Sequence, residues 1–112
     1  MKLIGSLVVF LLTLNLLAGA VEKVVPYELD GVQFEGRLIY DEAAATKGAP
    51  LACIVMVPNW MGPTENAYAK ARMIAGDSYA VFVADMYGVE VRPSSADEAA
   101  EADQPLNFTD DA

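Results

Sequence analysis

The chain has 112 residues, which is enough for one small domain. It carries 16 acidic residues, 7 basic residues and no histidine, so its formal net charge is −9. This acidic balance argues against binding to nucleic acid or to anionic lipid, because both need a basic protein surface. A lone cysteine and the lack of histidine argue against a zinc site, and the sequence has no calcium-loop pattern. We therefore expect no metal, no cofactor and no nucleic-acid partner.

The first 20 residues have the three parts of a secretory signal peptide. A basic start at Lys2 precedes the apolar run 3–17, and Ala18-Gly19-Ala20 is a small-x-small cleavage site. We expect cleavage after Ala20 and export to the periplasm or the exterior of a bacterial cell, with no stable membrane span afterwards. The alternative is an uncleaved N-terminal helix that anchors the protein, although the apolar run is short for a span and polar residues interrupt it.

The segments after the signal peptide predict an antiparallel hairpin. Residues 24–29 are a strand candidate, which Pro26 places at a sheet edge. Asp30-Gly31 is a dipeptide preferred in tight hairpin turns. Residues 32–40 alternate in polarity, as a half-buried strand does, and a surface loop with one helical turn is expected over 41–50. The apolar face of this strand is expected to hold Val32, Phe34, Leu38 and Tyr40, with Ile39 on the opposite face among polar residues.

The next segments predict a parallel βαβ unit. Residues 51–57 are continuously apolar, which is typical of a strand covered on both faces, so Cys53 within it is expected to be buried and inert. Thr64 is a candidate N-cap for a helix to Ala75, and residues 79–84 predict a second buried strand. The inner face of the helix is expected to hold Ala67, Ala71, Ile74 and Ala75.

The last part of the chain predicts an acidic helix and a tail. Ser95-x-x-Glu98 is a capping-box pattern, and regular periodicity ends at Asp103. The fold class is therefore α/β, with an antiparallel hairpin followed by a βαβ unit whose crossover should be right-handed. The predicted organisation is a signal peptide over 1–20, an α/β domain over 21–102 and an irregular acidic tail over 103–112.

Three motifs in this order resemble the dienelactone hydrolase family. They are the hairpin over 27–40, the loop over 57–62, and the segment 79–88, which ends in an Asp-Met-Tyr-Gly turn. The resemblance implies the N-terminal part of an α/β-hydrolase sheet. It also implies hydrolysis of a small-molecule carboxylic ester or lactone by a Cys or Ser nucleophile, an Asp and a His, in that chain order. In the family all three lie downstream of the matched part, so the chain as given is expected to lack them and to be inactive.

The same resemblance points to one part of the catalytic machinery that is present. Acyl transfer needs donors for the oxyanion, and in α/β-hydrolases one N–H comes from the loop after the third strand. That loop here holds Asn59, Trp60 and Met61, and the resemblance implies Trp60 N–H as the donor. Well-known members with a cysteine nucleophile carry a glutamate at the Asn59 position. Arg92, after the turn, is a candidate to bind a substrate carboxylate, and the alternative is an ordinary surface arginine.

The alternative function is a short non-catalytic exported binding or interaction module, since the triad is missing. Ser78 fits the pattern Gly-x-Ser-x-Ala, but a helix precedes it and a strand follows, which is the reverse of a nucleophile elbow. In the strand order of the family, 51–57 lies between the fourth and fifth strands. Without a fifth strand its hydrophobic edge would be unpaired, so we expect the isolated chain to be poorly soluble or molten.

Overall fold

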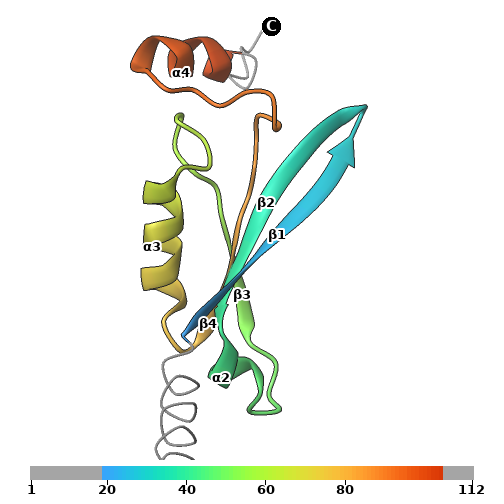
Figure 1. The fold of residues 1–112 in the computed structure, drawn as a ribbon, viewed down its shortest axis with the longest axis vertical. Coiled ribbons are helices and arrows are strands. Elements are labelled where there is room, and N and C mark those ends of the chain that lie inside the picture. Colours follow the sequence, from blue (N-terminus) through green and yellow to red (C-terminus); the bar gives the residue numbers. More distant parts are fainter. Residues whose placement is uncertain (1–18, 105–112) are drawn as a thin grey trace, which may run out of the picture.

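The computed structural model describes residues 19–104, which form a four-stranded sheet in the order β1-β2-β4-β3 (Figure 1). The predicted signal segment up to residue 18 and the tail from 105 lie outside the described residues. No helix within 19–104 is both long and apolar enough to cross a bilayer. The elements are β1 (Ala20–Leu29), β2 (Val32–Asp41), α2 (Glu42–Ala45), β3 (Ala52–Met56), α3 (Glu65–Ala75), β4 (Tyr79–Val83) and α4 (Ala96–Asp103).

β1 and β2 form the predicted hairpin. Asp30 and Gly31 have φ values of 51° and 80°, which is the left-handed conformation that a two-residue type I′ turn requires. The antiparallel register pairs Leu29 with Val32 at the turn and continues to Ala20 at the far end. β1 is thus longer than the predicted strand over 24–29, and it lies at a sheet edge, as expected from its proline.

The start of β1 is tied to its neighbours by charged side chains. The Glu22 carboxylate accepts from Arg37 at 3.2 Å and also pairs with Arg72 of α3. The Arg37 guanidinium in turn lies 3.6 Å from the ring centroid of Tyr68, a cation–π contact between β2 and α3. These contacts fasten the first half of β1 to β2 and α3.

The core lies between the sheet and α3, which covers one face (Figure 1). Thr64 caps this helix, since its hydroxyl accepts from the Ala67 N–H at 3.3 Å. The predicted inner face of α3 is confirmed for its three alanines, which are buried. The prediction is wrong for Ile74, whose side chain is exposed. The predicted buried face of β2 is also wrong. Ile39, which was expected on the polar face, faces α3 and is fully buried. The core cluster comprises Ile39, Ala71, Ala75, Val81 and Val83.

β3 pairs in parallel with β4, from Ala52 opposite Tyr79 to Met56 opposite Val83, which confirms the βαβ unit. The prediction that 51–57 is covered on both faces is wrong. β3 lies at the sheet edge, and only its α3 side is packed. On the other side Val55 is 65% exposed, and Cys53, expected to be buried, is exposed as well.

α4 begins with the predicted capping pattern in a modified form. The Ser95 hydroxyl accepts from the Glu98 N–H at 3.2 Å, as a capping box requires. The Glu98 carboxylate instead accepts from the N–H and the hydroxyl of Ser94, at 2.7 and 2.8 Å. The helix includes Asp103, so it extends one residue beyond the predicted end of the domain.

Candidate active site

The candidate site lies at the carboxyl ends of β3 and β4. Because the two strands are parallel, these ends meet at one edge of the sheet, where α/β proteins commonly bind ligands. The Ala84 N–H donates to the Met56 carbonyl at 2.9 Å, so the strands stay together up to this edge. Two loops leave from here. The oxyanion loop (57–64), named after its predicted role, follows β3, and the Asp85 loop (84–93) follows β4.

The oxyanion loop contains a tight turn that Asn59 holds at two points. Its carbonyl accepts from the Gly62 N–H at 2.8 Å, and its side-chain oxygen accepts from the Met61 N–H at 3.0 Å. Gly62 has a φ of 78°, which favours glycine. The Trp60 N–H donates no hydrogen bond within residues 19–104. Among the three predicted loop residues, Trp60 therefore offers a backbone donor that the turn does not use.

The Asp85 loop is organised by a buried carboxylate. The Asp85 residue is 2% exposed, and its side chain accepts from the N–H groups of Glu35, Tyr87 and Gly88 at 3.0 to 3.1 Å. Arg92 donates to both carboxylate oxygens, at 2.9 and 3.2 Å. This arrangement satisfies a buried charge with an opposite charge and with backbone dipoles.

Two opposing effects set the pKa of Asp85. Burial raises it, but the hydrogen-bonded Arg92 and the N–H groups of Glu35, Gly88 and Tyr87 outweigh burial and lower the pKa below its ordinary value. Asp85 is therefore ionised at neutral pH. The guanidinium of Arg92 is already engaged by this carboxylate, and binding of a substrate carboxylate by Arg92 stays a prediction.

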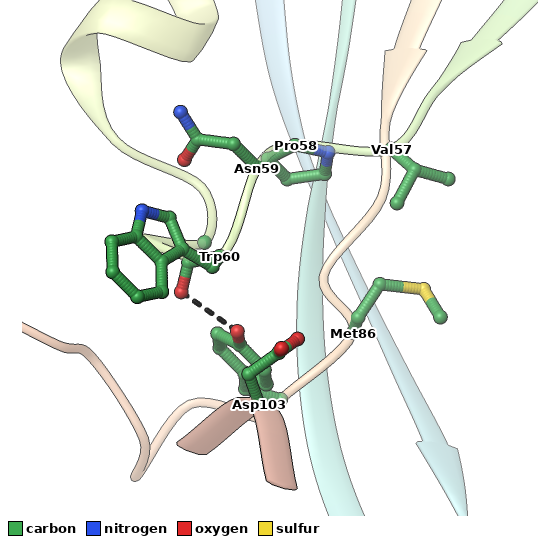
Figure 2. Close-up of a pocket in the computed structure, with 8 residues that line it drawn as sticks. Val57, Pro58, Asn59, Trp60, Met86 and Asp103 are labelled. Carbon is green, nitrogen blue, oxygen red and sulfur yellow. Dashed lines mark hydrogen bonds between the residues drawn. The ribbon is translucent and has the colours of Figure 1, made fainter. Parts of the chain in front are cut away.

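Tyr87 joins the two loops. Its hydroxyl donates to the Trp60 carbonyl at 2.7 Å, the dashed line in Figure 2. Burial, together with the charge of Asp103, raises the pKa of Tyr87, so its hydroxyl keeps its proton at neutral pH. A cavity of about 120 Å³ lies between the loops and α4. It is lined by Val57, Pro58, Asn59, Trp60, Gly62, Met86, Tyr87 and Asp103.

Comparison with known proteins identifies the scaffold that carries this site. A family model described as the dienelactone hydrolase family matches residues 39–110. The chain belongs to this family. Its fold is similar to that of a solved protein named m3DLH, with a TM-score of 0.68 and 25% identity over 79% of this chain and 35% of the other.

A second solved structure has a fold similar to that of this chain. It is a dienelactone hydrolase-like promiscuous phosphotriesterase from metagenomic libraries, with a TM-score of 0.68 and 24% identity, covering 79% of this chain and 35% of the other. The chain therefore spans about a third of the length of these solved relatives. A comparison with curated proteins found no match.

Ser78 lies at the opposite end of β4 from the cavity between the two loops. Ser78 comes directly before β4, and its hydroxyl donates to the Asp77 carboxylate at 2.9 Å. A helix precedes it and a strand follows, so the expectation that it is not on a nucleophile elbow is confirmed. Residues 19–104 contain no cluster of side chains suited to a metal ion. The link from Tyr87 to Trp60 has no local signal in the sequence, because the two residues lie 27 positions apart.

Proposed function

We propose that this protein contributes to the hydrolysis of small-molecule carboxylic esters or lactones, and that its oxyanion loop binds the oxyanion. Membership of the dienelactone hydrolase family supports the reaction class. Within residues 19–104 the Trp60 N–H donates no hydrogen bond, and Trp60 lines the cavity, which supports the role of the loop. In this proposal a nucleophile, an acid and a histidine base from outside the 112 residues complete the site, because the chain has no histidine.

The geometry of the turn suits this chemistry. A tetrahedral intermediate is stabilised by donors that are fixed before the reaction, because they need no reorganisation when the charge develops. Trp60 is the second residue of the turn from Asn59 to Gly62, and the hydrogen bonds of Asn59 fix the backbone on either side of it. Asn59 thus supports the loop, whereas an amide cannot supply the proton-accepting role of a glutamate at this position.

A chimera tests the proposal. Residues 20–104 would replace the matching segment of an active full-length family member, which supplies nucleophile, acid and base. We expect the chimera to hydrolyse a p-nitrophenyl ester, and Trp60→Pro to lower its kcat by about 100- to 1000-fold, the usual effect of one lost oxyanion donor. Proline suits the second position of a turn, so this change removes the N–H and retains the turn.

The matched control is Trp60→Ala, which removes the indole ring and keeps the N–H. It should retain most of the kcat of the chimera. Equal losses of kcat in both variants would contradict the assignment, and so would a cooperatively folded chimera without hydrolysis. Circular dichroism and thermal unfolding of each variant separate a chemical effect from a loss of folding.

We also propose that the protein is exported and cleaved after Ala20. The motive is the three-part pattern of the first 20 residues. Expression in a bacterial host and fractionation should yield a periplasmic or secreted protein whose first residue is Val21. Recovery of the uncleaved chain from the membrane fraction would instead support the anchored alternative.

A further inference from the structure

The peptide unit between Trp60 and Met61 is held on both sides. Its carbonyl accepts from the Tyr87 hydroxyl at 2.7 Å, and its N–H donates to the Asn59 side chain at 3.0 Å. A peptide unit is planar, so two hydrogen bonds on opposite sides restrict its rotation. The preceding peptide unit, which carries the Trp60 N–H, is held at its own carbonyl, because the Asn59 carbonyl accepts from the Gly62 N–H at 2.8 Å.

Tyr87 is itself held in place from two directions. Its N–H donates to the Asp85 carboxylate at 3.1 Å. Its ring lies against Gly62, where a Cβ atom would come within 3.3 Å of the ring. Gly62 therefore permits both the positive φ of the turn and the close approach of the ring.

The anchor behind Tyr87 is the buried ion pair. Asp85 receives Arg92 and three backbone N–H groups, as described above, and the backbone of Asp85 is held as well. The Tyr27 hydroxyl donates to the Asp85 carbonyl at 2.7 Å and accepts from its N–H at 3.0 Å. The hairpin, the Asp85 loop and the oxyanion loop are therefore connected by hydrogen bonds in series.

We propose that Tyr87 is a positioning residue that orients the oxyanion loop through the Trp60 carbonyl, and that the Asp85–Arg92 pair holds Tyr87 for this task. Tyr87 does not touch the reacting atoms in this proposal. What the loop binds rests on the proposed function, but the orientation of the loop is a property of the chain that can be measured without substrate.

The test uses the 112-residue chain labelled with ¹⁵N and ¹³C, with every variant made in a Val55→Lys background so that pairing through the exposed edge of β3 is suppressed. Tyr87→Phe removes the hydroxyl and keeps the ring against Gly62. We expect the Trp60 carbonyl resonance to shift and the amide exchange of Met61 and Gly62 to become roughly fivefold faster, the ratio that about 1 kcal/mol of lost hydrogen bonding produces. Amides of β4 should exchange at their original rates.

Two further variants serve as a control for the lost hydroxyl and as a test of the Asp85–Arg92 anchor. Tyr79→Phe removes an exposed hydroxyl at the start of β4 and should leave the oxyanion loop unchanged. Arg92→Gln weakens the anchor and should speed exchange at Met61 and Gly62 in the same direction. An unchanged Trp60 carbonyl in Tyr87→Phe would overturn the proposal, as would equal acceleration over all of β4, which indicates a purely structural role.

The positioning role of Tyr87 and the oxyanion role of Trp60 can fail independently, and the two experiments tell these failures apart. If Tyr87→Phe loosens the loop while the chimera is folded and inactive, the positioning holds and the oxyanion role fails. If the chimera depends on the Trp60 N–H while the loop in Tyr87→Phe is unchanged, the oxyanion role holds and the positioning fails.

Discussion

Replacing Asp85 with alanine should destabilise the chain by about 3 kcal/mol, which is a large share of the stability of a small domain. The substitution leaves Arg92 without its counter-charge. It also leaves the N–H groups of Glu35, Tyr87 and Gly88 without the acceptor that they share. Because Arg92 is about a third exposed, water compensates part of its loss, so we do not expect the upper range for a buried pair.

The measurement is urea unfolding followed by the fluorescence of Trp60, which is the single tryptophan of the chain. Asp77→Ala is the matched control, because Asp77 is an exposed aspartate whose side chain, within residues 19–104, accepts only from the neighbouring Ser78. It should change the free energy of unfolding by less than about 0.5 kcal/mol. An equal decrease in the free energy of unfolding in Asp77→Ala and Asp85→Ala would show that the buried network of Asp85 does not stabilise the fold more than an exposed aspartate does.

The acid dependence of unfolding provides a second arm of the same experiment. The pKa of Asp85 is lowered in the folded chain, so its contribution to stability is fully present above the unfolded-state pKa of about 3.9. The contribution is lost as the pH falls through the lower folded-state pKa. Wild type should therefore lose more stability than Asp85→Ala between neutral pH and about pH 3, and parallel curves would contradict this assignment.

Replacing Val55 with lysine should largely suppress self-association of the chain. β3 is an edge strand, and within the described residues its outer backbone groups have no strand beside them. Val55 and Val57 are well exposed there, and no charged residue occurs from 51 to 61. Such an uncharged apolar edge is a template for pairing with another copy, and a lysine on the edge opposes that pairing.

Sedimentation velocity of wild type and Val55→Lys at equal concentration measures the effect, with a reductant present to exclude disulfides through the exposed Cys53. The matched control is Met73→Lys, since Met73 is 82% exposed on α3, away from the edge. Both changes reduce the net charge from −9 to −8, so general repulsion cannot explain a difference between them. Equal sedimentation coefficients for both variants would contradict the proposal that the edge of β3 drives self-association.

Local rules predicted much of the fold because they need only neighbouring residues. The turn at Asp30 and Gly31, the Thr64 cap and the Ser95 cap each follow from the chemistry of a few adjacent positions. The βαβ order followed from two apolar runs separated by a helical pattern.

The wrong predictions concern which neighbouring elements pack against a strand. An apolar run at 51–57 fits a doubly covered strand, but the position of β3 in the sheet decides whether its second face is packed. Cys53 was misplaced for that reason. Ile39 was misplaced because alternation gives the two faces of a strand but does not say which face the helix covers.

The candidate site was predicted in part. The resemblance located the loop with Trp60, whereas the hydrogen bond from Tyr87 depends on two loops that meet only in the folded chain. Asp85 gave a weak signal, as an acidic residue at the end of a buried strand. Its pairing with Arg92 could not be derived, since the two residues lie seven positions apart along an irregular loop.

The long first strand bears on the proposed cleavage after Ala20. Ala20 and Val21 pair with Asp41 and Tyr40, so the bond that a signal peptidase would cut lies inside the hairpin ladder. Proteases act on accessible, locally open segments. If the leader is removed at this bond, removal must come before β1 joins β2, during or directly after passage through the membrane. The timing of folding would then control processing, and a chain that folded too early would keep its leader.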